Sequence, residues 1–286
     1  MVSCWLDVRL ILNMNFQEVH MAMRTLLKTS GKFIAIASLL VLSSCGFTPS
    51  DQRYQEVETV VASELPAYVP FPLIASASRS AEQSTNGIWK HYSLPGKQPT
   101  AYRYAWIDGR HGMQATATKS ASMLRQSIRV EPAQLGVIRF SWKVPQLIAG
   151  ADLSQRETHD SPVRVVLAFE GDRSKFSMKN SMLSELASAL TGEPMPYATL
   201  MYVWCNACPQ GEMLSSPRTD RIREIPLESG PDRLGQWRHY ERDIRADFEK
   251  AFGEPPGALL DVGLMSDTDN TRETAVAWYG AVSLAD

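Results

Sequence analysis

Apolar and polar residues alternate in short runs along most of the chain beyond residue 88, and turn-forming residues separate the runs. Alternation with a period of two is typical of strands that bury one face. The alternating runs are 101–107 (AYRYAWI), 113–118, 123–130 and 137–144. The run 163–169 (VRVVLAF) is almost continuously apolar and predicts a strand buried on both faces. Several short strands at close spacing predict an all-β sandwich.

Two short segments have helical spacing instead. The segment 181–190 ends before Gly192, a residue that commonly terminates helices. Its predicted apolar face consists of Met182, Leu186 and Leu190. The segment 243–252 begins at Asp243, a favourable N-cap, and is followed by Gly253. The sequence therefore predicts a β-sandwich with two short helices.

The C-terminal run 261–284 contains two alternating segments joined by a loop rich in side-chain oxygens, 267–271 (DTDNT). We expect this loop at the rim of the sandwich, with Asp267, Asp269 and Asn270 as ligand-binding candidates. An EF-hand is excluded, since Arg272 and Trp278 occupy the sixth and twelfth positions instead of Gly and Glu. An irregular calcium site at Asp267 and Asp269 stays open, as does an ordinary turn whose side chains bond their own backbone.

Arg164 is the one charged residue within the apolar run 163–169. If it faces inward it needs a carboxylate partner, for which Asp267 and Asp269 are candidates. If it faces outward it is simply solvated. Four aromatic residues offer either a stacking surface for sugar rings or part of the core. They are Trp204, Trp237, Trp278 and Tyr279.

Residues 1–44 are typical of an export signal. Basic residues precede the ten-residue apolar run 33–42, and small residues then precede Cys45. A membrane-spanning helix would need roughly 20 apolar residues. The pattern resembles a bacterial lipoprotein signal with lipid on Cys45, and Gly46 resembles the outer-membrane-sorted class. We therefore expect a lipid-anchored protein of the cell envelope, at the outer membrane and facing the periplasm.

The natural start of this signal is Met21 or Met23. We expect 45–66 to be a lipidated tether and 67–286 to be a single domain. The export segment contains four of the 29 basic and two of the 31 acidic residues, so the remaining chain has a net charge of −4. This charge argues against a nucleic-acid partner.

Cys205 and Cys208 form a CxxC motif. In an oxidising compartment a local disulfide between them is expected, while a metal or redox role stays open. A zinc site would need two further ligands at matching spacing, and the sequence has no second CxxC or paired histidines.

The strand-to-helix segment LGQWRHYERDIRADFEKAFGEPP, followed by VGLMSDTDNTRETAVAWYGAVSL, resembles an uncharacterised bacterial family, the domain of unknown function DUF3047. Earlier segments fit the same pattern: RFSWKV, PVRVVLAFEG, YVWCN and TDRIREIPLESG. The resemblance covers about Trp89 to Leu284. It implies a jelly-roll sandwich similar to galactose-binding-like modules on an exported protein, and it implies no established activity. The cysteines at 205 and 208 are not expected as a family feature.

Motifs for common chemistries are missing from the sequence: it has no G-x-S-x-G, no P-loop and no G-x-G-x-x-G, and its histidines are scattered. Asp243 and Asp247 share a helix face, but acids are favoured in a first helical turn. We therefore expect a non-catalytic ligand-binding module, with carbohydrate or an envelope protein as partner and no required cofactor. A polysaccharide-acting enzyme and a structural or protein-binding lipoprotein are the alternatives. Two carboxylates converging in one cleft would favour the enzyme, and a domain without a polar cleft would favour the structural protein.

Overall fold

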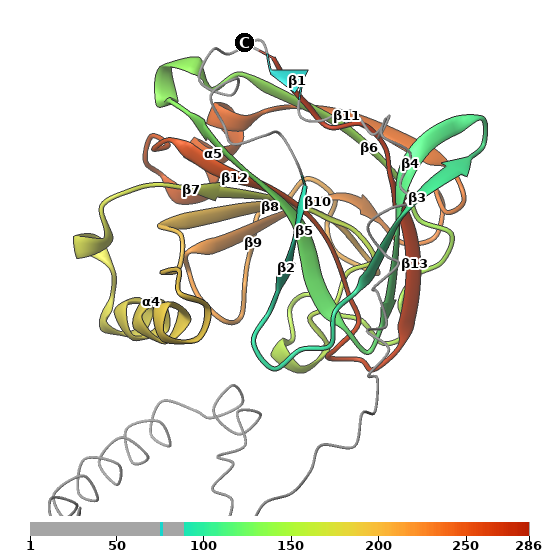
Figure 1. The fold of residues 1–286 in the computed structure, drawn as a ribbon, viewed down its shortest axis with the longest axis horizontal. Coiled ribbons are helices and arrows are strands. Elements are labelled where there is room, and N and C mark those ends of the chain that lie inside the picture. The colour runs from blue at the N-terminus through green and yellow to red at the C-terminus, as the bar shows by residue number, and fades with distance from the viewer. Residues whose placement is uncertain (1–74, 77–88, 286) are drawn as a thin grey trace, which may run out of the picture. The chain divides into compact units, whose positions relative to one another are not determined.

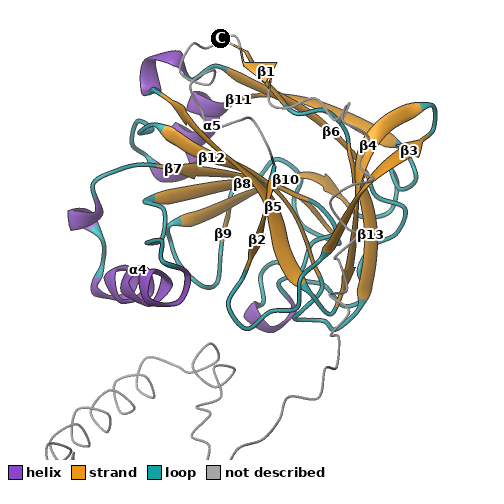
Figure 2. Cartoon of the chain, in the orientation of Figure 1, coloured by secondary structure: helices purple, strands orange, loops and turns teal. Residues whose placement is uncertain are grey.

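Strands account for most of the regular structure in the computed structural model, which describes residues 75–76 and 89–285 (Figure 1, Figure 2). The chain divides into two units, Met1–Ala67 and Tyr68–Asp286, and every described element belongs to the second. The predicted signal, tether and Cys45 lie outside the described residues. The part of the chain that the structure describes contains no helix long and apolar enough to cross a membrane.

The strands form two seven-stranded sheets, which we call sheet A and sheet B. In sheet A the order is β1-β14-β6-β13-β4-β3, with β11 paired to β6. Its strands are β1 (Ala75–Ser76), β3 (Ala101–Ile107), β4 (Arg110–Thr118), β6 (Val137–Lys143), β11 (Trp237–Asp243), β13 (Thr274–Tyr279) and β14 (Ser283–Ala285).

In sheet B the order is β2-β5-β12-β7-β8-β10-β9. Its strands are β2 (Lys90–Ser93), β5 (Ala121–Val130), β7 (Arg164–Phe169), β8 (Ala198–Cys205), β9 (Leu214–Ser215), β10 (Ile222–Ser229) and β12 (Leu259–Asp267). Most pairs are antiparallel, but β10 runs parallel to β8, a pairing that the sequence pattern did not predict. The two curled sheets form a jelly-roll β-sandwich, as expected.

The core lies between the two sheets. Phe140 on β6 stacks against Tyr202 on β8, with 5.4 Å between ring centroids. At the far end of the interface, the hydroxyl of Tyr279 on β13 donates to the carbonyl of Met265 on β12 over 2.5 Å. The strand β7 is buried at every position, which confirms the prediction from its apolar run.

Both predicted helices are present, with the bounds α4 (Met178–Thr191) and α5 (Ile244–Phe252). Asp243 caps α5 as predicted, accepting from the backbone N–H of Ala246 over 2.9 Å. Three short 3₁₀ helices lie in the connections, at Pro132–Gln134, Arg156–Thr158 and Arg173–Lys175.

The predicted apolar face of α4 is wrong. Leu190 is 41% exposed, whereas Asn180 and Ser184 are the buried residues of this helix. The amide of Asn180 donates to Asp220 and its carbonyl accepts from Thr219, so polar contacts to the connection before β10 orient the helix. Hydrogen bonds therefore outweigh the weak apolar periodicity here.

Candidate functional site

A row of three side chains crosses the outer face of sheet A. Strand pairing places Trp237 on β11 opposite Lys143 on β6, and Lys143 opposite Trp278 on β13. Because Trp142 points into the core, the alternate residue Lys143 points outward together with its two neighbours. The ammonium of Lys143 lies 6.0 Å from the ring centroid of Trp278. Two indoles therefore flank one cation on a rigid strand surface.

A pocket of about 590 Å³ adjoins this row. Small residues lie at its centre, among them Ser141, Gly280, Ala281 and Ser283. Longer polar side chains surround them, namely Arg110, His111, Arg139, His239 and Glu241. The hollow arises where the pairing of β13 with β6 ends at Tyr279. The chain pairs with β6 again, as β14, only from Ser283.

The indole of Trp237 lies beside two glycines, Gly112 and Gly280, and Gly280 also lines the pocket. A Cβ added at Gly280 would lie 3.5 Å from Cζ3 of Trp237 and 2.1 Å from the hydroxyl of Ser141. A Cβ added at Gly112 would lie 2.9 Å from the carbonyl oxygen of Tyr279 and 3.5 Å from Cη2 of the same indole. The absence of side chains therefore allows the Ser141 hydroxyl to approach Gly280 and the Tyr279 carbonyl to approach Gly112, and the indole lies beside both glycines.

Polar contacts hold this indole. Its Nε1 donates to Oδ2 of Asp108 over 3.0 Å, and that carboxylate also accepts from Lys143 over 2.6 Å. The hydrogen bond from Lys143 is the main reason that the pKa of Asp108 lies below its usual value. The guanidinium of Arg110 lies over the Trp237 ring, 4.9 Å from its centroid.

The basic groups of the pocket have few acidic partners. Arg110 donates from Nη1 to Nε2 of His239 over 3.2 Å. Arg139 pairs with Glu241 across the strands over 2.7 Å, and both side chains are more than half exposed. Glu241 is the only carboxylate among the residues that line the pocket.

Arg164 and Asp267 are paired, which confirms the predicted inward-facing alternative. The guanidinium Nε donates to Oδ1 of Asp267 over 2.9 Å, and the same guanidinium forms an ion pair with Glu224 on β10. His159 donates from Nε2 to Glu224 over 3.0 Å. All four side chains are buried, so this network ties three strands of sheet B to the preceding loop.

The pKa values of the two carboxylates of the network are shifted in opposite directions. Burial alone would raise the pKa of Glu224, but the charge of Arg164 and the contacts from His159 outweigh it and lower that pKa. Burial raises the pKa of Asp267, and the neighbouring Asp160 and Asp269 oppose the lowering effect of Arg164. Two buried carboxylates share one guanidinium, and Asp267 is the one with further acids beside it.

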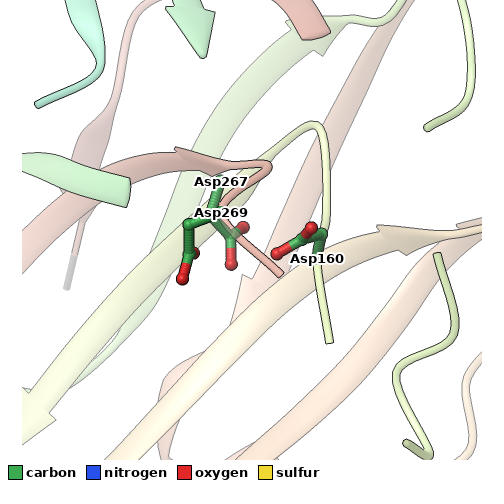
Figure 3. Close-up of side chains that lie close together, drawn as sticks. All are labelled: Asp160, Asp267 and Asp269. Carbon is green, nitrogen blue, oxygen red and sulfur yellow. The ribbon is translucent and has the colours of Figure 1, made fainter. Parts of the chain in front are cut away.

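Three carboxylates converge at the rim of sheet B. Figure 3 shows Asp160 facing Asp267 and Asp269, and one oxygen of each lies within 4.8 Å of the others. Protein donors already occupy them: Asp269 pairs with Lys97, and Asp267 pairs with Arg164. Asp160 accepts four hydrogen bonds, from the backbone and side chains of Asn270 and Thr271. Asn270 therefore links the loop to the connection before β7, through Asp160 and the carbonyl of His159.

Two of the aromatic candidates, Trp204 and Tyr279, belong to the core. Trp204 is fully buried, and its Nε1 donates to the carbonyl of Gly230 over 3.1 Å, so it belongs to the core. Tyr279 is likewise fully buried. Cys205 and Cys208 form the expected disulfide at the end of β8. Among the sequence candidates, Trp237 and Trp278 are thus the pair that reaches the outer face of sheet A.

The pocket itself is absent from the sequence candidates. Its residues come from β4, β6, β11, the connection before β14 and the start of β14. Most of these segments are far apart in the sequence. The available signal is the polar set of alternate positions in Trp237–Asp243, which marks an outward strand face. Pairing of that strand with β6 brings the set beside Arg139 and Ser141.

Solved structures similar to this chain include proteins that act on or bind polysaccharides. A family 11 carbohydrate-binding module of a cellulosomal cellulase from Clostridium thermocellum is 10% identical, with 68% of this chain and 85% of that chain covered and a TM-score of 0.34. A cellulase derived from Cel12A of Rhodothermus marinus is 12% identical, with 68% and 94% covered and a TM-score of 0.36. The xyloglucanase domain of NopAA, a type three effector from Sinorhizobium fredii, is 9% identical, with 68% and 92% covered and a TM-score of 0.38.

No curated protein matches the sequence. A family model described as "Protein of unknown function (DUF3047)" matches residues 88–283, which confirms the resemblance found in the sequence. The matched range includes both faces of the sandwich, the pocket and the buried network. The chain is a member of the DUF3047 family.

Proposed function

We propose that this domain is a non-catalytic module that binds carbohydrate on the outer face of sheet A. The observation that carries the proposal is the juxtaposition of two outward indoles, Trp237 and Trp278, with a pocket lined by hydrogen-bonding side chains. The C–H faces of a sugar ring pack on aromatic rings, for which Trp278 is the candidate because Arg110 lies over the Trp237 ring. The hydroxyl groups of the sugar need donors and acceptors at the edges, which the pocket supplies. The pocket volume of about 590 Å³ suits a small ligand or one unit of a longer chain.

Binding is favoured over hydrolysis by the carboxylates of the pocket. Most glycoside hydrolases use two carboxyl groups on either side of the scissile bond. Glu241 is the single carboxylate in the lining, and Arg139 already pairs with it. The acidic cluster of Asp160, Asp267 and Asp269 lies on sheet B and its connections, where protein donors occupy it.

The cell envelope is the proposed location, with lipid on Cys45 as the anchor. The support is the order of basic, apolar and small residues before that cysteine. A Cys45→Ser variant is expected to leave the membrane fraction for the soluble envelope fraction. Mass spectrometry of the wild-type protein should find the N-terminal cysteine lipidated. An unmodified Cys45, or membrane association unchanged by the substitution, would refute the anchor.

Affinity electrophoresis through gels that contain soluble polysaccharides tests the binding function. We expect retardation of the wild-type protein in at least one gel, and its loss in Trp237→Ala and Trp278→Ala. Tyr92→Ala is the matched control, because it removes a half-buried aromatic ring from the outer face of sheet B, beneath Arg125. Melting curves establish that each variant is folded. Equal retardation of all four proteins would refute a site on sheet A.

A further inference from the structure

The pocket on sheet A has an excess of basic groups. Arg110, His111, Arg139 and His239 line it together with one acid, Glu241. The chain as a whole has a net charge of −2, so the basic excess is a local feature of the pocket. A site for a neutral glycan has no need of this excess, because amides and hydroxyls bind neutral hydroxyl groups equally well.

Arg110 is held in place by groups other than carboxylates. An indole face lies 4.9 Å beneath its guanidinium, and a histidine nitrogen accepts one of its five N–H donors. Arg110 takes part in none of the ion pairs within the described part of the chain. Its position is therefore fixed while its charge is not neutralised by direct contact.

Arg139, which lines the pocket from β6, is the second basic group. Its partner Glu241 is 59% exposed, and exposed ion pairs of this kind are weak. An incoming carboxylate can therefore compete with Glu241 for Arg139. Two guanidinium groups then face one pocket, and a planar guanidinium matches a carboxylate through two parallel hydrogen bonds.

We propose that the pocket recognises the carboxylate of an acidic sugar, a uronic-acid residue of a polysaccharide. This inference rests on the proposed carbohydrate-binding function and adds the charge class of the ligand. Arg110 binds the carboxylate, Trp237 supports the guanidinium, and Arg139 supplies the second set of donors.

Isothermal titration of the full chain in detergent, with trigalacturonate and its uncharged methyl ester, tests the inference. At pH 6 we expect the acid to bind roughly ten-fold more tightly than the ester. Arg110→Gln should remove the preference, while Arg103→Gln, which removes an exposed charge elsewhere on the same face of sheet A, should keep it.

The outcomes separate the inference from the proposed function. Equal affinity for the acid and the ester would overturn the acidic-sugar inference and leave carbohydrate binding intact. Retardation by neutral polysaccharide gels without binding of trigalacturonate would do the same. Failure to bind trigalacturonate, its ester and every polysaccharide gel would overturn both.

Discussion

The guanidinium of Arg164, at the start of β7, donates to Oδ1 of Asp267, at the end of β12, over 2.9 Å, and both side chains are buried. The chain leaves sheet B at Asp267 and enters sheet A at Thr274. The ion pair therefore fixes the point at which the C-terminal run crosses between the sheets. We interpret it as a structural feature of the rim, separate from the ligand pocket.

Asp267→Asn is expected to destabilise the protein by roughly 3 kcal/mol, because it removes one of the two carboxylates that neutralise the buried charge of Arg164. Asp269→Asn is the matched control. Its partner Lys97 is 29% exposed, so we expect a loss of only about 1 kcal/mol. Urea unfolding of the three proteins measures both values. Equal stability of Asp267→Asn and the wild type would contradict a structural role for the pair.

Acid should weaken the same network through Glu224. Since the pKa of Glu224 is lowered in the folded protein, its contribution is fully present above about pH 4.3 and is lost as the pH falls through the lower, folded pKa. Glu224→Gln should therefore be less stable at pH 7, by roughly 3 kcal/mol, and lose less stability between pH 5 and pH 3. The difference between their slopes reports the titration of Glu224 together with its effect on Asp267, because both carboxylates pair with Arg164. Parallel slopes would show that Glu224 titrates alike in the folded and unfolded chains.

Local patterns predicted much of this fold. Alternation gave the bounds of Ala101–Ile107 to the residue, and the capping residues on both sides of α5 gave that helix. The pairing partner of a strand is harder to predict, because alternation indicates which face is buried but not which strand lies alongside. The C-terminal run shows the difference: both of its strands were predicted, yet they belong to different sheets.

The candidate site was accessible to prediction only in part. Arg164 stood out as a charge in an apolar run. One of its two acidic partners, Asp267, was predicted, whereas Glu224 on β10 was not. The pocket depends on the register that sets Trp237 beside Lys143, and on glycines at 112 and 280 that allow Tyr279 and Ser141 to approach closely. A register between strands that are some 90 residues apart has no local signature, so the sequence offered Trp237 and Trp278 without their surroundings.

Calcium is expected to leave the melting temperature unchanged. Each of the three converging carboxylates at the rim already binds a donor of the protein, and two of those donors are the cations Arg164 and Lys97. A calcium ion would have to displace them. Thermal melting with calcium and with a chelator checks this expectation. A rise in melting temperature with calcium that disappears in Asp160→Asn would instead establish a calcium site at this rim.

The disulfide should persist in the exported protein. Cys205 and Cys208 both lie in the tryptic peptide 180–218, whose mass before reduction should be lower by two hydrogens than after reduction. The closed loop is short, so loss of the disulfide in Cys205→Ser with Cys208→Ser should cost about 2 kcal/mol. Two alkylated cysteines in the unreduced peptide would contradict the disulfide.

Obstructing the pocket on sheet A tests directly whether the ligand binds there. Ala281 lines the pocket and is exposed, so Ala281→Trp should fill the hollow without disturbing the core. Ala133→Trp, at an exposed position outside the pocket lining, is the matched control. In affinity electrophoresis with the polysaccharide that retards the wild type most, we expect loss of retardation in Ala281→Trp and full retardation in Ala133→Trp. Full retardation of a folded Ala281→Trp protein would rule out the pocket as the binding site.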